Sequence, residues 1–428
     1  MLIFLAIFFL LLLLTGLPVA FVMGITSVIM LAFFSNTPLL LVPEIMYNSL
    51  ASFPLMAVPF FVIAATFMVR GGTARYLVDA ANALVGSFTG GLAIVCVISS
   101  MIFAAICGSS IATALSMGVI IIPAMMNIGY KRSFATGIVA ASGTMGIMIP
   151  PSVALIIYGI ITEQSIPRLF LAGVLPGVLE GMLYISWIIY YSKKMGYGGE
   201  KRKGLNEIFL LIFKALPAFS LPFIVLGGIY SGIVTVTEAA ALAAVASLII
   251  SMFIYREIKP RQVIPLIGES MKLAGMVLLI VSTAMVFGTW ITHAGIPARL
   301  ADLVVNYNLP WWGFLIIVNF LLLALGMFLE VVSIMLITLP IIFPLLSPLG
   351  IDPIHFGIIM MVNMEVAFIT PPVGLNLFVL STASKAPLSE VIRGVLPFVL
   401  LSILELAIIT YWPAFSLYLP KLLMPTPS

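Results

Sequence analysis

The chain has 428 residues, of which 63% are hydrophobic and only 8% are charged, with a formal net charge of +4. Soluble domains carry charge on about a quarter of their residues, so this composition excludes an ordinary soluble protein. Apolar stretches of about 20 residues, enough to cross a bilayer, recur along the whole length. We therefore expect an all-α polytopic membrane protein. The two cysteines, Cys96 and Cys107, lie in apolar sequence and predict neither a disulfide framework nor a metal site.

The first half of the chain is expected to cover residues 1–203. Its first apolar run, Leu2 to Ser35, is interrupted at Thr15-Gly16-Leu17-Pro18 and predicts two short crossings. The run has no basic n-region, so we interpret it as a retained helix and not as a signal peptide. An interfacial segment, a span and an amphipathic surface helix are then predicted in turn: Leu41–Ser52, Phe53–Val69 and Thr73–Val85.

The next stretch, about 90–128, predicts a re-entrant hairpin. Two apolar arms, Gly90–Ile106 and Ile111–Ile128, meet at a polar Gly-Ser corner. A broken helix follows over about 133–161, interrupted by Pro150-Pro151, and a span over Leu169–Tyr191 ends this half. Two consecutive prolines break a helix and free its carbonyls and amides. In a bilayer such backbone persists only where protein buries it or a polar cavity borders it.

The second half, 204–428, follows the same plan. Three spans are predicted first, at Ile208–Tyr230, Val234–Tyr255 and Met271–Ile291, and an amphipathic stretch follows near Arg299 and Asp302. A hairpin over 311–348 has its corner at Glu330, a broken helix over 354–383 is interrupted at Pro371-Pro372, and the last span covers Val391–Ala414. The interval from Pro150 to Pro371 equals the interval from Pro123 to Pro344, and we call it the repeat offset. So regular a match indicates an internal repeat.

The basic residues predict how the halves are oriented. Cytoplasmic loops carry an excess of Lys and Arg, and the basic loops here are 70–75, 131–132, 193–203, 256–261 and 385. Placing them inside leaves Arg168, Arg299 and Lys421 outside and puts both termini in the periplasm. The two repeats are then inverted relative to each other, a topology typical of secondary transporters that work by alternating access.

Two groups of oxygen donors are expected, one at each hairpin corner and the adjacent break. Hard cations such as sodium prefer several oxygen ligands, and unwound helices supply carbonyls. The first sodium group is Ser109, Ser110, Gly143, Thr144, Gly146 and Pro150, and the second is Gly326, Glu330, Ser333, Thr370, Val373 and Asn376. The alternatives are small residues that pack helices closely and kinks without a ligand. Candidate substrate-binding residues are Ser109, Thr113, Ser142, Ser152, Glu365 and Asn363.

Other ionisable residues in apolar sequence remain open to two interpretations. Carboxylates inside spans are usually functional or paired, and this class contains Glu180, Glu238, Glu330, Glu365 and Glu405. Glu330 and Glu365 belong to the expected sites, whereas the other three are either structural or involved in proton coupling. His293 and His355 are expected in outer loops, exposed to solvent. The chain has no nucleophile elbow, phosphate loop or zinc spacing, so we expect neither an enzyme nor an organic cofactor.

Several motifs together resemble the large membrane subunit of tripartite ATP-independent periplasmic (TRAP) transporters. They are Gly108-Ser109-Ser110-Ile111-Ala112-Thr113, Ala141-Ser142-Gly143-Thr144, Pro150-Pro151-Ser152, Tyr47-Asn48-Ser49-Leu50 before Pro54, and Val236-Thr237-Glu238-Ala239-Ala240-Ala241. The likeness covers essentially the whole chain. It implies an elevator-type sodium symporter of the bacterial inner membrane, with sodium sites at Ser109, Ser110, Gly143, Pro150, Gly326, Thr370 and Val373.

The resemblance also implies partners and a substrate class. They are a small four-helix membrane subunit, expected as a separate chain, and a soluble periplasmic binding protein that delivers an organic acid anion. The sequence as a whole most resembles the sialic acid branch of the family. Transport of C4-dicarboxylates or other carboxylates is the alternative. A standalone sodium and divalent-anion symporter is a second alternative. An intramembrane enzyme lacks a catalytic pair here, and inverted repeats suit alternating access better than a channel.

Overall fold

The computed structural model describes residues 2–35 and 38–425, and every regular element in these ranges is a helix. The first half begins with one helix of 13 residues and one of 16, continues with a short helix and a 3-10 turn, and ends with seven further helices. Their bounds are α1 Leu2–Leu14, α2 Val19–Phe34, α3 Leu41–Leu50, η1 Phe53–Met56, α4 Ala57–Arg70, α5 Thr73–Val85, α6 Gly91–Cys107, α7 Ser110–Asn127, α8 Arg132–Thr144, α9 Val153–Ile161 and α10 Ile166–Met195. The two predicted short crossings are thus separate helices.

The second half begins after the segment 196–204. Its elements are α11 Leu205–Tyr230, α12 Val236–Ile249 with a π-helical end η2 Ile250–Ile254, α13 Pro260–His293, α14 Ile296–Asn306, α15 Trp311–Gly326, α16 Val331–Leu346, α17 Pro353–Ile369, α18 Leu375–Ser384, α19 Leu388–Tyr411 and α20 Ala414–Leu423. The predicted boundary at 203/204 falls in the connecting segment. The outermost residues of the two predicted halves, Met1 and 426–428, lie outside the described residues.

The two halves repeat one another at the offset found in the sequence. When the first half is moved along the chain by the repeat offset, α6, α7, α8, α9 and α10 fall on α15, α16, α17, α18 and α19, with small differences at the helix ends. Both breaks carry a cis peptide bond, Pro150-Pro151 in the first half and Pro371-Pro372 in the second. The repeat is therefore structural as well as sequential.

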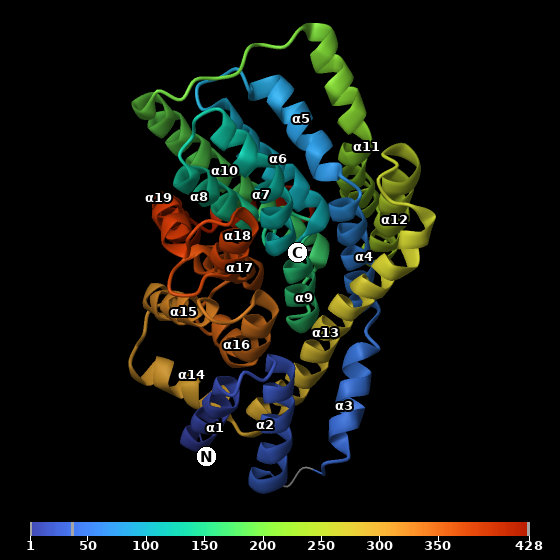
Figure 1. Ribbon diagram of the computed structural model, residues 1–428. Helices are drawn as coiled ribbons and strands as arrows, with labels where there is room; N and C mark the ends of the chain where they lie inside the picture. The colour runs from blue at the N-terminus through green and yellow to red at the C-terminus, as the bar shows by residue number, and fades with distance from the viewer. Residues whose placement is uncertain (1, 36–37, 426–428) are drawn as a thin grey trace.

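The helices form two groups (Figure 1). We call α1–α5 and α11–α14 the scaffold group and α6–α10 and α15–α20 the transport group, names that follow the elevator-type expectation. Within the transport group, α7 and α8 pack together and α19 packs on α8, whereas in the scaffold group α4 packs on α12 and α2 on α13. The arms of each predicted hairpin are two separate helices in contact, with α6 and α7 joined at Gly108-Ser109 and α15 and α16 at 327–330.

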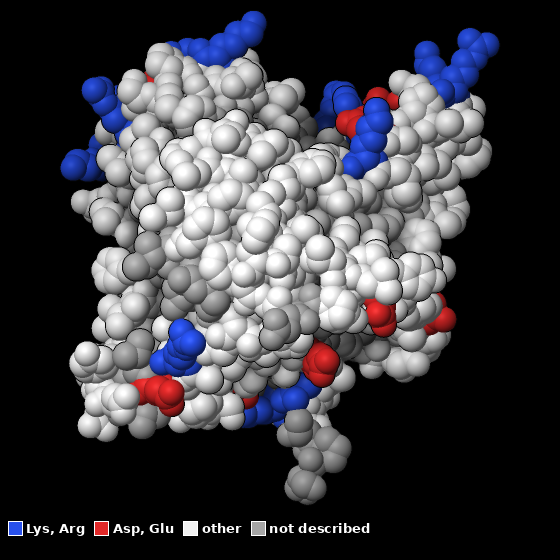
Figure 2. Space-filling model, turned by 90° about the horizontal axis from the view of Figure 1, so that it is seen from below, with Lys and Arg blue, Asp and Glu red and all other residues white. Residues whose placement is uncertain are grey.

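A broad uncharged band crosses the face of the molecule that Figure 2 shows. Seven helices of the described chain are long and apolar enough to cross a membrane, among them α10, α11 and α13. Figure 2 shows the band between an edge where Lys and Arg gather and an opposite edge that also carries several Asp and Glu. Exposed apolar side chains such as Phe209, Phe213 and Phe223 on α11 suit contact with lipid or another membrane chain. The expectation of a polytopic helical membrane protein is confirmed.

Two helices differ from the predictions. A basic segment before a span at Met271 was expected, but α13 already starts at Pro260, which occupies the first helical position, and the Gln262 side chain caps the Lys259 amide at 2.8 Å. Charged residues there are exposed and do not interrupt the helix. The last predicted span ends at Tyr411 and not at Ala414, and α20, which the sequence pattern did not predict, follows Pro413.

Candidate functional site

The corner of the first hairpin is a tight turn at the start of α7. Gly108 ends α6 with a φ of +57°, a left-handed conformation that favours glycine. Ser109 then caps α7, because its hydroxyl accepts a hydrogen bond from the Ala112 amide at 3.5 Å. The Thr113 hydroxyl donates to the Ser109 carbonyl at 2.8 Å. Ser109 and Thr113, both predicted to bind substrate, therefore lie at one corner.

The first break lies directly against this corner. It connects α8 to α9 through residues 145–152 and includes Gly146 and Pro151. A Cβ atom added to Gly146 would lie 2.8 Å from the Ser109 carbonyl group, and one added to Gly108 would lie 2.7 Å from the Pro151 oxygen. The backbone of the hairpin corner is therefore in direct contact with the backbone of the break. Such an arrangement brings several carbonyl oxygens close to one another.

The remaining members of the first group occupy the same break. Gly143 and Thr144 form the last turn of α8, and a Cβ atom on Gly143 would lie 2.7 Å from the Ala114 side chain of α7. The Thr144 hydroxyl donates to the Ala141 carbonyl at 2.6 Å. Ser152 caps α9 and donates to the Ile147 carbonyl within the break, with Pro150 between them in sequence. The structure thus places the first predicted sodium group on two touching segments.

Asn376, which was expected in the second group, contacts a residue of the first group. It lies in the first turn of α18, but its side-chain amide donates to the Ser110 hydroxyl at 2.8 Å and to the Ala140 carbonyl at 3.2 Å. The side-chain oxygen Oδ1 of Asn376 is buried and accepts no hydrogen bond from the described residues. The expectation grouped Asn376 by its distance along the chain from Pro371. In the fold, α18 packs against α7 of the other half, so Asn376 lies between the halves.

The second group is looser. A Cβ atom on Gly326, at the end of α15, would lie 2.5 Å from the Ala367 side chain of α17, so this hairpin also packs on its broken helix. The Ser333 hydroxyl donates to the Glu330 carboxylate at 3.4 Å. The Thr370 hydroxyl donates to the Val366 carbonyl at 2.6 Å, and Val373 lies in the break after it. Glu330 is exposed and Thr370 and Val373 are partly exposed, whereas the first group is largely enclosed.

The other predicted substrate residues are enclosed elsewhere in the transport group. Ser142 accepts a hydrogen bond from the Ser100 hydroxyl at 3.1 Å and therefore points toward α6. The Asn363 amide donates to the Asn319 side chain at 2.9 Å, toward α15. Glu365 is fully buried. The structure thus keeps Ser109, Thr113 and Ser152 together and separates Ser142, Asn363 and Glu365 from them.

The expectation that His355 is a solvated loop residue is wrong. His355 lies in α17 and is buried, with Nδ1 3.1 Å from the Ser416 hydroxyl and Nε2 3.4 Å from the Thr410 carbonyl. Asn319 donates to the Thr410 hydroxyl at 3.1 Å, so a chain of polar contacts runs from α20 to Asn363. The sequence pattern missed these partners because α20 was not predicted.

A cleft opens between the scaffold and transport groups. Its volume is about 450 Å³, and it is bordered by the segments 52–54, 159–167 and 235–237. The first and last of these belong to the scaffold group and the middle one to the transport group. Polar residues including Ser52, Gln164 and Thr237 line it. The cleft therefore lies at the boundary between the two groups.

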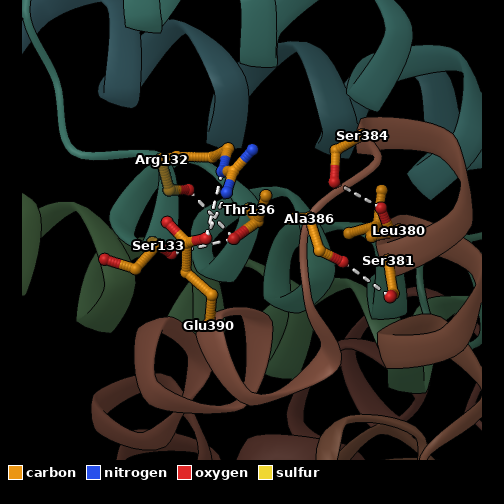
Figure 3. A network of polar contacts seen from close by, with 8 residues as sticks. All are labelled: Arg132, Ser133, Thr136, Leu380, Ser381, Ser384, Ala386 and Glu390. Atoms are coloured by element: carbon orange, nitrogen blue, oxygen red, sulfur yellow. Dashed lines mark hydrogen bonds and ion pairs between the residues drawn. The ribbon is translucent and has the colours of Figure 1, made fainter.

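The polar contacts at one end of the transport group are shown in Figure 3. The guanidinium of Arg132, at the start of α8, donates to the Glu390 carboxylate of α19 through Nε at 3.0 Å and Nη2 at 2.7 Å. The Ser381 hydroxyl donates to the Ala386 carbonyl at 2.8 Å and holds the connection from α18 to α19. These contacts hold α8, α18 and α19 together at an end that carries basic residues.

The chain matches known transporter components along nearly its whole length. A family model described as "Tripartite ATP-independent periplasmic transporter, DctM component" matches residues 6–415. The C4-dicarboxylate TRAP transporter large permease protein DctM of Pseudomonas aeruginosa is 43% identical, with 93% of each chain covered. Its namesake from Rhodobacter capsulatus is 40% identical, with 96% of this chain and 97% of the relative covered.

Two further comparisons are more distant. The sialic acid TRAP transporter large permease protein SiaM of Vibrio cholerae is 33% identical over 96% of this chain and 97% of its own. The crystal structure of the YdaH transporter of Alcanivorax borkumensis has a TM-score of 0.63 at 13% identity, with 88% of each chain covered. This last likeness concerns the fold alone.

Proposed function

This chain belongs to the DctM-component family of tripartite ATP-independent periplasmic transporters, and on that basis we propose that it forms the path for sodium-driven uptake of a C4-dicarboxylate. The family consists of transporter components, not of enzymes, and the chain is a multi-pass membrane protein. The observation that carries the proposal is the contact of a hairpin corner with a broken helix inside the transport group, at Ser109 and Gly146. We further propose that the chain lies in the bacterial inner membrane with both of its ends on the periplasmic side.

The substrate proposal differs from the sialic acid expectation. Relatives named for C4-dicarboxylates are 40% and 43% identical to this chain, whereas the sialic acid relative is 33% identical. All three align over nearly the whole chain, so the difference in identity does not come from coverage. We therefore place C4-dicarboxylates first and keep sialic acid as a competitor in the test below.

Sodium coupling is supported by chemistry and by charge. The corner and the break supply carbonyl and hydroxyl oxygens from Ser109, Gly143 and their neighbours without adding a formal charge, which suits a hard monovalent cation. A dicarboxylate that enters against a negative-inside potential costs about 2.3 kcal/mol per charge per 100 mV. More sodium ions than substrate charges must therefore enter together for the potential to favour uptake. Movement of the transport group against the scaffold group, as in an elevator, would carry both across.

The proposed complex includes two partners that the family description implies, a small membrane subunit and a soluble periplasmic binding protein. Neither predicted ligand group contains Lys or Arg, so recognition of the anion by charge is assigned to the binding protein. The exposed aromatic residues of α11, such as Phe209 and Phe213, offer an apolar surface for the small subunit.

The proposal is tested by uptake into proteoliposomes that hold this chain with its small subunit. Labelled succinate and labelled sialic acid are compared, each with and without the binding protein and with and without an inward sodium gradient. Succinate uptake that needs both additions is the expected result. Uptake with sodium alone would favour a standalone symporter, and uptake of sialic acid but not succinate would overturn the substrate assignment. Uptake without a sodium gradient would overturn the coupling ion.

A further inference from the structure

The segment that joins the two halves of the chain is fastened to the helices around it. We call residues 196–203, between α10 and α11, the strap. Gly196 ends α10 with a φ of +71°, a left-handed conformation that favours glycine. The Tyr197 amide then donates to the Ser192 carbonyl at 3.0 Å, and the Tyr197 and Tyr130 rings stack with their centroids 4.2 Å apart. The first residues of the strap therefore have a fixed position.

The middle of the strap lies against the connection between the scaffold and transport groups. That connection, residues 86–90, runs from α5 to α6. The Glu200 amide donates to the Gly86 carbonyl at 2.9 Å. A Cβ atom on Gly199 would lie 2.2 Å from the Ser87 carbonyl oxygen, so the two backbones are in direct contact. Because the strap is already ordered, a ligand that binds its side chains does not have to order the backbone as well.

Four cations on the strap and beside it have no ion-pair partner in the protein. Lys193 and Lys194 lie in the last turn of α10, and Lys201 and Arg202 follow in the strap. All four residues are exposed. The ion pairs found among the described residues all involve other cations. This end of the molecule therefore carries a concentrated positive charge.

The acidic residues of the same segment do not neutralise this charge. Two acidic residues lie between positions 196 and 207. The Glu200 carboxylate accepts a hydrogen bond from the Asn82 side chain of α5 at 2.9 Å. The Glu207 carboxylate pairs with Lys203 at 3.5 Å, one turn away. An anion that binds the four unpaired cations must therefore come from outside the chain.

The four cations lie at the level where the apolar surface of the molecule ends. On α10, Trp187, Tyr190 and Lys194 follow one another at intervals of three and four residues, so they share one side of the helix. Tyr190 is 59% exposed, and Trp and Tyr gather at the headgroup level of membranes. Beyond the strap, Leu205 begins α11 and is 81% exposed. The cations are thus placed beside the headgroups of a bilayer.

From this juxtaposition of four unpaired cations, an ordered strap and interfacial aromatic residues, we propose that the strap and the end of α10 bind the headgroups of anionic phospholipids. Ammonium and guanidinium groups donate hydrogen bonds to phosphate oxygens. Clusters of about four to eight Lys and Arg next to a membrane span are attracted to anionic leaflets. The bound lipid lies at the covalent junction of the scaffold and transport groups, and it is separate from both sodium groups.

A thermal-shift titration tests the proposal. The chain, purified with its small subunit in a neutral detergent, receives increasing amounts of phosphatidylglycerol, which is anionic, or of phosphatidylcholine, which is zwitterionic. We expect phosphatidylglycerol to raise the thermal midpoint more than phosphatidylcholine does. We also expect NaCl to reduce this difference, because salt screens exposed charges. Equal stabilisation by the two lipids would overturn the proposal.

The test variant replaces all four cations with glutamine: Lys193→Gln, Lys194→Gln, Lys201→Gln and Arg202→Gln. It should need at least ~10-fold more phosphatidylglycerol for the same shift. The matched control removes the same charge from exposed positions elsewhere: Arg256→Gln, Arg261→Gln, Lys272→Gln and Lys421→Gln. The control should respond like the unchanged protein, and an equal response of both variants would refute the site.

Two further arms separate the alternatives. Glycerol phosphate, a headgroup without acyl chains, should have no effect, and full stabilisation by it would assign the surface to a soluble phosphate. Where the fourfold variant does not fold, Lys193→Gln with Lys194→Gln should lose part of the response, and Lys193→Arg with Lys194→Arg should keep all of it. Loss of the response in the arginine variant would contradict recognition by charge. Neither sodium nor substrate is present, so the result is independent of the uptake assay.

Discussion

At the residue scale, Asn376 is the side chain that connects the second half of the chain to the first hairpin. Its amide donates to Ser110 and to the Ala140 carbonyl, so one residue links α18 with α7 and α8. The other hydroxyl contacts of the corner, such as that of Thr113 with Ser109, are local. Sequence spacing can predict the local bonds but not this link, because it depends on how the repeats interlock.

Replacement of Asn376 with Leu should therefore weaken the sodium group. The change removes two buried hydrogen bonds, to the Ser110 hydroxyl and to the Ala140 carbonyl, each of which contributes about 0.5–1.5 kcal/mol. We expect a lower thermal midpoint and a smaller stabilisation by sodium, read by a thermal-shift titration of the purified complex. Ser384→Ala on the same helix removes only a bond to the Leu380 carbonyl and serves as the control. An unchanged response to sodium would remove Asn376 from the site.

Gly146 tests the contact of backbone with backbone. A methyl group there would lie 2.8 Å from the Ser109 carbonyl group, so Gly146→Ala should push the hairpin corner away from the break. Overpacking of this kind costs about 1–3 kcal/mol, and we expect sodium-driven uptake to fall at least tenfold. Gly275→Ala in α13, where a Cβ atom meets nothing within 4 Å, should keep activity and gain about 0.5–1 kcal/mol from helix propensity. Equal behaviour of the two variants would contradict the proposed contact.

At the element scale, the first broken helix is fixed at its basic end by α19. The helices α8 and α19 cross so closely that a Cβ atom on Gly394 would lie 1.7 Å from the Ser133 carbonyl oxygen, and one on Gly137 would lie 2.2 Å from Gly394. Beside this crossing, Arg132 and Glu390 form the ion pair of Figure 3. Glycine allows the close approach, and the ion pair sets the register of the two helices.

Substitution of the glycine at the crossing and substitution of the ion pair beside it should have different effects on the protein. Gly394→Ala should separate α8 from α19 and reduce both folding yield and uptake severalfold, because the obstructing atom is backbone and cannot move aside. Glu390→Gln should lower the thermal midpoint only at low ionic strength, since partly exposed pairs are screened by salt. The exchanged pair Arg132→Glu with Glu390→Arg should restore part of that loss. A salt-independent effect of Glu390→Gln would mean that the carboxylate acts in another way.

Much of the order of helices could be predicted from the sequence, because prolines and glycines indicate where helices break and where hairpins turn. The repeat offset, read from pairs such as Pro150 and Pro371, anticipated the matching helices of both halves. The beginning of α13 and the existence of α20 could not be read in this way, because charge and Pro413 suggest a loop where the chain is helical. The partners of His355 are tertiary contacts, and no local pattern reports them.

At the scale of the whole molecule, the scaffold and transport groups share an extended boundary, and the cleft of about 450 Å³ opens along it. Contacts across the boundary include α13 with α16 and α4 with α6. An uncharged band crosses the face that Figure 2 shows, between edges that carry charged residues. Under the proposed elevator mechanism, movement of one group relative to the other would change the side from which a site held within the transport group is reached.

A pair of engineered cysteines can test this movement. Ser52 lies in the scaffold group and Gln164 in the transport group, and both line the cleft. A flexible cross-linker between Ser52→Cys and Gln164→Cys should abolish uptake, and the activity should return when a cleavable linker is reduced. The native cysteines, Cys96 and Cys107, are buried and should not react.

The matched control joins Ser52→Cys to Val236→Cys, which lines the same cleft but belongs to the scaffold group. A rigid carrier with a fixed path would be affected equally by both linkers, because each crosses the same opening and obstructs it to a similar extent. A carrier in which the transport group moves as a body would tolerate the link within the scaffold and stop only when the two groups are joined. Full uptake by the Ser52–Gln164 cross-linked protein would exclude this movement, and with it the elevator proposal.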